Sequence, residues 1–111
     1  MRKIDRRVVF ASAIAIAVGF ILALPARAQD ASATTLYKSK CAACHGPDGT
    51  GSATGKTMGA HDFTSADVQK MSDAELISII TDGKNKMPAY GKSLKAEQIK
   101  GLVAYIHTLK K

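Results

Sequence analysis

The sequence predicts an all-α domain in which a few helices are joined by long loops. A helix-capping box and an apolar helical stripe each mark a helix in the C-terminal half of the 111 residues. No segment shows the alternating pattern of a half-buried strand, and no repeat is present. A domain of this size gains little stability from its core alone, so a metal, a disulfide or another cross-link is expected to help.

The N-terminal segment has the parts of a secretory signal peptide. Residues 1–7 are basic, residues 8–24 are continuously apolar or small, and Ala26-Arg27-Ala28 supplies a small-residue cleavage site. We expect cleavage after Ala28, so that residues 1–28 are the signal peptide and residues 29–111 form one domain. An uncleaved membrane anchor is the alternative, because the apolar run lies at the low edge of spanning length.

Residues 33–44 form the first expected helix of the domain, because they hold good helix formers and neither Gly nor Pro. Cys41 and Cys44 fall on one face of it. The turn-rich segment of residues 46–51 ends this helix. Residues 52–60 are small, polar and without periodicity, so we expect a loop lying over the surface.

A short helix is expected over residues 66–70, with Phe63 packing inward just before it. The following helix has a stronger signal, since Ser72 and Glu75 form a capping box at its start. Gly83 is a usual terminator of such a helix. The broad apolar face between these residues predicts contact with the core or with a bound group.

The last helix is expected over residues 96–109, after a loop at residues 84–91. Lys95 stands where a Ser or Thr cap is usual, so Ser93 is expected to cap this helix instead. The apolar stripe of the helix consists of Ile99, Leu102, Val103, Ile106 and Leu109.

The most specific motif in the chain is Cys41-Ala42-Ala43-Cys44-His45. Two cysteines at this spacing, followed directly by a histidine, indicate covalent attachment of a c-type haem. Cys41 and Cys44 would form the thioethers to the porphyrin, and His45 would bind the iron as the proximal ligand. The sequence therefore predicts one covalent haem c.

Other chemistries of the same motif are weaker. A disulfide between Cys41 and Cys44 would close too small a loop to stabilise the fold much. A redox-active cysteine pair of the thioredoxin type needs a βαβ pattern, which is missing. Zinc would need two further ligands at suitable spacing, and only His61 and His107 remain.

The charge pattern excludes nucleic-acid binding. The whole chain has a formal net charge of +7, but part of it lies in the signal peptide, and no arginine follows Arg27. A nucleic-acid binder would show clustered arginines and lysines with aromatic platforms for base stacking. Nothing of this kind occurs in residues 29–111.

The sixth ligand of the iron separates an electron carrier, which uses a methionine, from a ligand-binding haem protein with an open position. Met87 is favoured, because Pro88 biases it toward extended backbone and the chain from His45 is long enough to pass around the porphyrin. The alternative is that Met87 only fills a gap in the core. The remaining candidates are Met58 and His61 in the loop, and Met71 and His107, which are expected to be structural.

The chain resembles the class I c-type cytochromes, specifically the small bacterial monohaem electron carriers, from about residue 33 to residue 109. The resemblance implies a fold of crossed N- and C-terminal helices, with short helices and long loops around one haem. It also implies that Met87 is the axial methionine. The matching segments are Leu36-Tyr37, Cys41 to Gly46, Gly83 to Lys86 leading into Met87-Pro88-Ala89-Tyr90, and Leu102 to Ile106; they place Ala33 and Tyr37 against Leu102 and Tyr105.

One departure from the family concerns the proximal histidine. Many members have a proline after the haem motif whose carbonyl accepts the other ring N–H of that histidine. This chain has no proline between Pro47 and Pro88. A backbone carbonyl within residues 52–60 is the expected substitute as the partner of His45.

These features predict an exported, periplasmic and monomeric protein that carries one electron between redox partners and is not an enzyme. The alternatives are a haem module tethered to a respiratory complex, if the N-terminal segment is retained, and a haem protein reactive toward small ligands or peroxide, if Met87 is not a ligand. Lysines around Met87 predict a positive surface that steers acidic partners, or else only a solvated surface. These are Lys84, Lys86, Lys92 and Lys95.

Overall fold

The computed structural model describes Gly19 and residues 26–111. Most of the predicted signal peptide lies outside these residues, and the predicted domain boundary stays a prediction. In the described residues, helices joined by turns and loops form the fold, and no β-strand occurs among them. This confirms the all-α fold class. None of their helices has the length and apolar character needed to cross a membrane.

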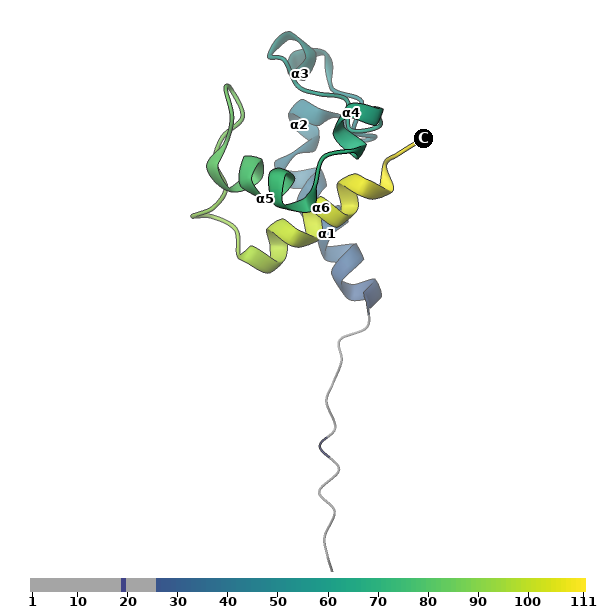
Figure 1. Ribbon diagram of the computed structural model, residues 1–111, viewed down its shortest axis with the longest axis vertical. Coiled ribbons are helices and arrows are strands. Elements are labelled where there is room, and N and C mark those ends of the chain that lie inside the picture. Colours follow the sequence, from purple (N-terminus) through teal and green to yellow (C-terminus); the bar gives the residue numbers. More distant parts are fainter. Residues whose placement is uncertain (1–18, 20–25) are drawn as a thin grey trace, which may run out of the picture.

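Two terminal helices cross at the centre of the fold (Figure 1). These are α1, Ala26–Lys40, and α6, Ala96–Thr108. They come close where Gly101 faces Ala33, since a Cβ at Gly101 would lie 3.6 Å from the Ala33 Cβ. One turn further along, the rings of Tyr37 and Tyr105 pack with centroids 4.9 Å apart. The expected crossing of the terminal helices is therefore confirmed.

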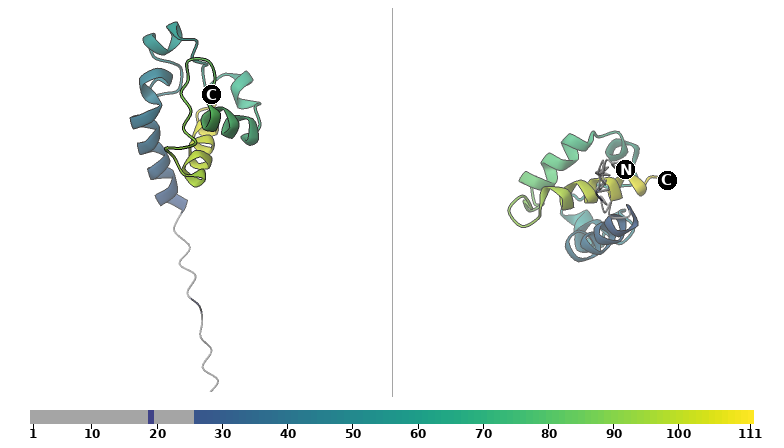
Figure 2. Two further views of the ribbon diagram at one scale, coloured as in Figure 1. Left: turned by 90° about the vertical axis from the view of Figure 1, so that its left-hand side faces the viewer. Right: turned by 90° about the horizontal axis from the view of Figure 1, so that it is seen from below.

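The helix α5, Asp73–Asp82, packs on the other side of α6. Viewed from below, α6 lies between α5 and α1 (Figure 2). The expected capping box is present at the start of α5. The Glu75 N–H donates to Ser72 Oγ at 3.2 Å, and the Ser72 N–H donates to Glu75 Oε2 at 2.8 Å. The helix ends at Gly83, whose φ of 74° is in the left-handed region.

The three short helices are α2, Ala42–His45, α3, Ala53–Thr57, and α4, Ala66–Gln69. The single helix expected over residues 33–44 is interrupted at Cys41, where φ is −116°. The Cys41 N–H still donates to the Tyr37 carbonyl at 2.8 Å, so the break is a bend between α1 and α2. It begins the short separate helix that carries Cys44 and His45.

Two local expectations are wrong. Residues 52–60 contain α3, because the Ser52 hydroxyl accepts the Gly55 N–H at 2.9 Å and so starts a helix. Ser93 does not cap α6; Lys95 is the N-cap residue, and its N–H donates to Gln98 Oε1 at 2.8 Å. Gln98 thus accepts the N–H of the N-cap residue itself, and the Lys95 side chain makes no cap hydrogen bond.

The core consists of apolar side chains from all parts of this arrangement, and Tyr37, Leu102 and Val103 are fully buried within it. Phe63 is buried, as expected from its position before α4. Met71 is half-buried and packs against the same core. The buried apolar side chains are those of Ala33, Tyr37, Phe63, Val68, Leu76, Ile80, Leu94, Ile99, Leu102, Val103 and Ile106.

Candidate haem-binding site

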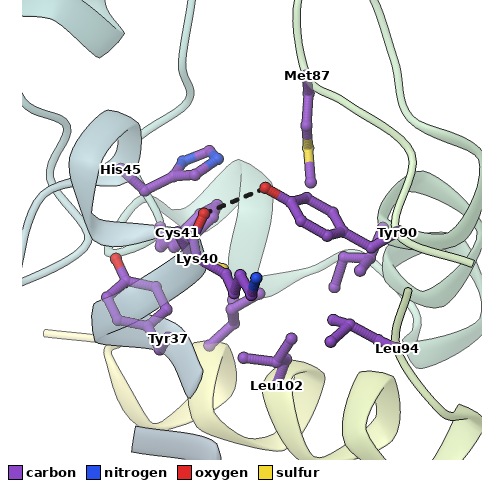
Figure 3. A pocket seen from close by; sticks show the side chains of 11 residues that line it. Tyr37, Lys40, Cys41, His45, Met87, Tyr90, Leu94 and Leu102 are labelled. Carbon is purple, nitrogen blue, oxygen red and sulfur yellow. Dashed lines mark hydrogen bonds between the residues drawn. The ribbon is translucent and has the colours of Figure 1, made fainter. Parts of the chain in front are cut away.

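Three of the four predicted site residues line a cavity beside the crossed helices (Figure 3). Cys41, His45 and Met87 all line it. Cys44 is not among its lining residues and lies half-buried in α2. The other lining side chains are mostly apolar or aromatic; they are Tyr37, Lys40, Phe63, Ile80, Tyr90, Leu94, Leu102 and Ile106.

The position of His45 follows from the short helix α2. The His45 N–H donates to the Cys41 carbonyl at 2.9 Å, and the Gly51 N–H donates to the His45 carbonyl at 2.7 Å. The buried Tyr37 hydroxyl donates to the Gly46 carbonyl at 2.7 Å, which ties α1 to the end of the motif. Burial raises the pKa of Tyr37, so this hydroxyl stays a donor.

The His45 imidazole is in an apolar environment. Burial lowers the pKa of the ring. A contact with the His61 backbone raises the pKa, but this effect is smaller than that of burial. A neutral imidazole is the form that binds a metal. The ring of Phe63 stacks on it, with centroids 4.2 Å apart and planes 19° apart.

The expected hydrogen bond from residues 52–60 to the His45 ring is not found. Within the described part of the chain, the buried Nδ1 atom of His45 has no hydrogen-bond partner of normal geometry. The backbone that influences the ring is that of His61, just after the expected segment. The contact with the His61 backbone raises the pKa of the ring, against the larger effect of burial.

The cysteines do not have the character of a redox or zinc site. Cys41 and Cys44 are not joined by a disulfide. Burial, together with the neighbouring Cys44, raises the pKa of Cys41 to about 11, whereas a reactive thiol needs a lowered pKa. No group of three or more His, Cys, Asp or Glu side chains gathers in the described residues as a metal site would need.

A tight contact between α2 and α3 holds the cysteine segment in place. The Ser52 hydroxyl donates to the Ala43 carbonyl at 2.7 Å, and the Ser52 N–H donates to the Cys44 carbonyl at 3.0 Å. Gly55 lies so close that a Cβ on it would overlap the Cys44 carbonyl oxygen. A glycine is therefore required at this point.

Met87 is presented by a tight turn between α5 and α6. The Met87 N–H donates to the Lys84 carbonyl at 2.9 Å, the Lys84 N–H donates to the Met87 carbonyl at 3.2 Å, and Asn85 has a φ of 53°. The Tyr90 N–H then donates to the Ile80 carbonyl at 2.9 Å, which attaches the segment to α5. The side chain of Met87 points into the cavity from a different wall than His45 (Figure 3).

The other candidate ligands are placed elsewhere. Met58 is 40% exposed, His61 is also exposed, and Met71 packs in the core. His107 is half-buried and has its Nε2 2.9 Å from Asp73 Oδ1, so it is structural as expected. Among the described residues, Met87 is thus the methionine that lines the cavity.

Three features of the site were not expected from the sequence. They are the stacking of Phe63 on His45, the close approach at Gly55, and a hydrogen bond from the Tyr90 hydroxyl to the Lys40 carbonyl, 3.1 Å long. Ser52, directly before a helix-compatible run, was an available signal for the turn containing Gly55. The other two join residues far apart in the chain and have no local signature.

The donor set fits a c-type haem. Two thiols, one imidazole and one thioether come from α2, its junction with α1, and the turn before α6. Sulfur and imidazole nitrogen are ligands that haem iron takes. The apolar walls suit the porphyrin face, since burial of apolar surface is favourable.

Comparison with known proteins decides the family. A family model described as cytochrome c oxidase, cbb3-type, subunit III, matches residues 28–106. Cytochrome c6 of Rippkaea orientalis is 39% identical over 92 residues, which cover 78% of this chain and 77% of that protein. The chain belongs to the class I c-type cytochromes. Members of this family bind haem c covalently, and this cytochrome carries the cysteine spacing that goes with it.

A further relative and a solved structure are also similar to this chain. The cbb3-type oxidase subunit CcoP of Azospirillum brasilense is 39% identical over 97 residues, which cover 81% of this cytochrome. This cytochrome spans 33% of the length of that CcoP subunit. The solved structure of the KustC0563 c-type cytochrome is 34% identical and has a TM-score of 0.68, over 71% of this chain and 98% of that one.

Proposed function

We propose that this cytochrome carries single electrons between redox proteins and performs no substrate chemistry of its own. The observation that supports this most is that His45 and Met87 line one apolar cavity from separate elements, beside Cys41. A histidine and a methionine are the axial pair of electron-transfer haems, which leave no open position for a substrate. The similarity to cytochrome c6 supports the same role.

Each site residue has a separate task in this proposal. Cys41 and Cys44 would hold the haem covalently, and His45 and Met87 would bind its iron. When bound, the haem supplies the one-electron change of its iron. The apolar walls exclude water, and the thioether of Met87 favours the ferrous state, so both raise the reduction potential.

The proposal is tested by absorption spectra of the exported protein in the ferric and ferrous states. We expect the bands of a low-spin thioether-bound haem, with the weak red band of methionine ligation in the ferric spectrum. Rapid binding of CO by the unmutated ferrous protein would contradict methionine ligation. It would favour the haem protein that reacts with small ligands.

Redox partners with acidic surfaces fit the lysines around the Met87 turn. Lys84, Lys86, Lys92 and Lys95 are all exposed. A cluster of positive charge raises the rate of association with an acidic partner, and salt screens this effect. We expect electron transfer to an acidic partner to slow as ionic strength rises, and Lys86→Glu to slow it more than Lys100→Glu on α6. A rate that does not change with salt contradicts this docking surface.

Release as a free periplasmic protein depends on cleavage of the N-terminal segment after Ala28, and a retained segment would anchor the exported domain in the membrane. The similarity to the CcoP subunit favours a second function, a haem module that remains attached to a larger respiratory assembly. Mass spectrometry of the mature protein distinguishes the two. A chain that begins at Gln29 supports a free periplasmic carrier, and a chain that keeps residues 1–28 supports an anchored module.

A further inference from the structure

Two kinds of contact act on the His45 ring in this protein. A metal-binding histidine usually donates its second ring N–H to a carbonyl or carboxylate, which fixes the ring. Here the backbone of His61 acts on the ring, although the buried Nδ1 makes no hydrogen bond of regular geometry within the described residues. The side chain of Phe63 stacks on the ring, with centroids 4.2 Å apart.

Phe63 can fix the His45 ring only if it is itself fixed. Its N–H donates to the Gly49 carbonyl at 2.8 Å, which attaches it to the turn that follows the haem motif. Its carbonyl accepts a hydrogen bond of 2.6 Å from Nε2 of Gln69. The Phe63 backbone is therefore held on both sides.

Gln69 is the last residue of α4, and both the nitrogen and the oxygen of its carboxamide make contacts. Its Nε2 also donates to the Ile106 carbonyl at 2.9 Å, so one amide group joins the Phe63 segment to α6. Because both donors of this amide are engaged, its oxygen must be the acceptor. That oxygen lies 3.4 Å from Nδ1 of His107, and His107 is held in turn by Asp73.

We infer that Gln69 is a positioning residue for the proximal histidine. It acts through Phe63, whose stacked ring restrains the His45 ring beside the backbone contact of His61. This inference rests on the proposed role of His45 as the proximal ligand. Gln69 itself does not line the cavity.

The test uses Gln69→Met in the haem-loaded protein, a change that keeps the length of the side chain and removes both donors. Gln98→Met is the matched control. Gln98 is also half-buried, and its one hydrogen bond of this kind caps α6 at Lys95, away from Phe63. Proton NMR of the ferric state is the readout, because the paramagnetically shifted resonances of the haem methyl groups depend on the orientation of the axial ligands.

We expect Gln69→Met to change the pattern of these shifted resonances and Gln98→Met to leave it as in the unmutated protein, even where both lower the unfolding temperature. Phe63→Leu should change the pattern as well. In the double variant, Gln69→Met should add nothing to the effect of Phe63→Leu, because Gln69 acts through Phe63. Phe63→Leu keeps Gln69, so it tests the role of the stacked ring even if Gln69→Met is recovered poorly.

One result would contradict the proposed function, and another would contradict only the role of Gln69. An unmutated protein without the resonances of an axial histidine would overturn the proposed function, and this inference with it. An unmutated protein that has them, together with a Gln69→Met pattern that matches Gln98→Met, would overturn only the role of Gln69.

Discussion

The hydroxyl of Tyr90 donates a hydrogen bond of 3.1 Å to the backbone carbonyl of Lys40, 50 residues earlier in the chain. Lys40 is the last residue of α1 and directly precedes Cys41. Tyr90 follows Met87 in the segment that is attached to α5. One hydrogen bond thus joins the two halves of the site, the cysteine segment and the methionine segment (Figure 3).

Tyr90→Phe tests this connection. Removing the hydroxyl should lower the free energy of unfolding by about 0.5–1.5 kcal/mol, the usual net value of such a hydrogen bond. It should also loosen the Met87 segment, so that exogenous imidazole replaces the methionine faster. Stopped-flow mixing of the ferric protein with imidazole measures this rate.

Tyr105→Phe is the control for that experiment, because it removes a hydroxyl from the face of α6 that packs on Tyr37. We expect it to leave the rate of imidazole binding unchanged. Equal rates in Tyr90→Phe and the unmutated protein would show that the Tyr90 hydroxyl does not restrain Met87.

Gly55→Ala should be strongly destabilising, because the added Cβ would overlap the Cys44 carbonyl oxygen. The helices α2 and α3 must then separate, and overpacking of this kind typically costs about 1–3 kcal/mol. Gly101→Ala is the matched change in α6, where the new methyl group would meet Ala33 at an ordinary 3.6 Å. We expect it to be neutral or stabilising by up to about 1 kcal/mol, since alanine favours helix. Chemical denaturation of both variants checks this, and equal losses would contradict the close contact at Gly55.

The capping box of α5 predicts a specific pH dependence. Hydrogen bonds from the Ser72 backbone and side chain hold the pKa of Glu75 below its ordinary value of 4.5. Because the folded-state pKa is depressed, the stabilisation by the ionised carboxylate is present above pH 4.5 and is lost as the pH falls through the folded-state pKa.

Glu75→Gln removes this titration and keeps the shape of the side chain. The unmutated protein should unfold at a higher temperature than Glu75→Gln at pH 7, and the difference should shrink toward pH 3. Thermal unfolding of both proteins across this range measures it. A difference that stays constant with pH would show that the charge of Glu75 contributes nothing.

Much of the fold could be predicted because its signals are local. Ser72 and Glu75 mark the start of α5, and the periodic apolar residues of α6 mark its buried face. The crossing of the terminal helices was expected from the resemblance to a known family, and the packing of Tyr37 on Tyr105 confirms it. The haem motif itself is a contiguous sequence, so its residues were identified directly.

The contacts that complete the site could not be predicted in the same way. The stack of Phe63 on His45 depends on the hydrogen bond of 2.8 Å from the Phe63 N–H to the Gly49 carbonyl, which joins two segments that are distant in the chain. The partner expected for His45 was placed in residues 52–60, but that stretch forms α3, which packs on Cys44 instead. Ser52 was an available signal for the start of α3. The stack on His45 and the packing of α3 on Cys44 are tertiary contacts between separate segments, and these leave no pattern in the local sequence.

The central claim is that Met87 is the distal ligand of an electron-carrying haem, and the reduction potential of two methionine variants tests it most directly. Met58 is the matched control, because it is exposed and lies outside the cavity. We expect Met87→Ala to lower the midpoint potential, to remove the red band of the ferric spectrum and to let the ferrous protein bind CO, whereas Met58→Ala should change none of these. A Met87→Ala protein with the midpoint potential and spectrum of the unmutated cytochrome would contradict the claim.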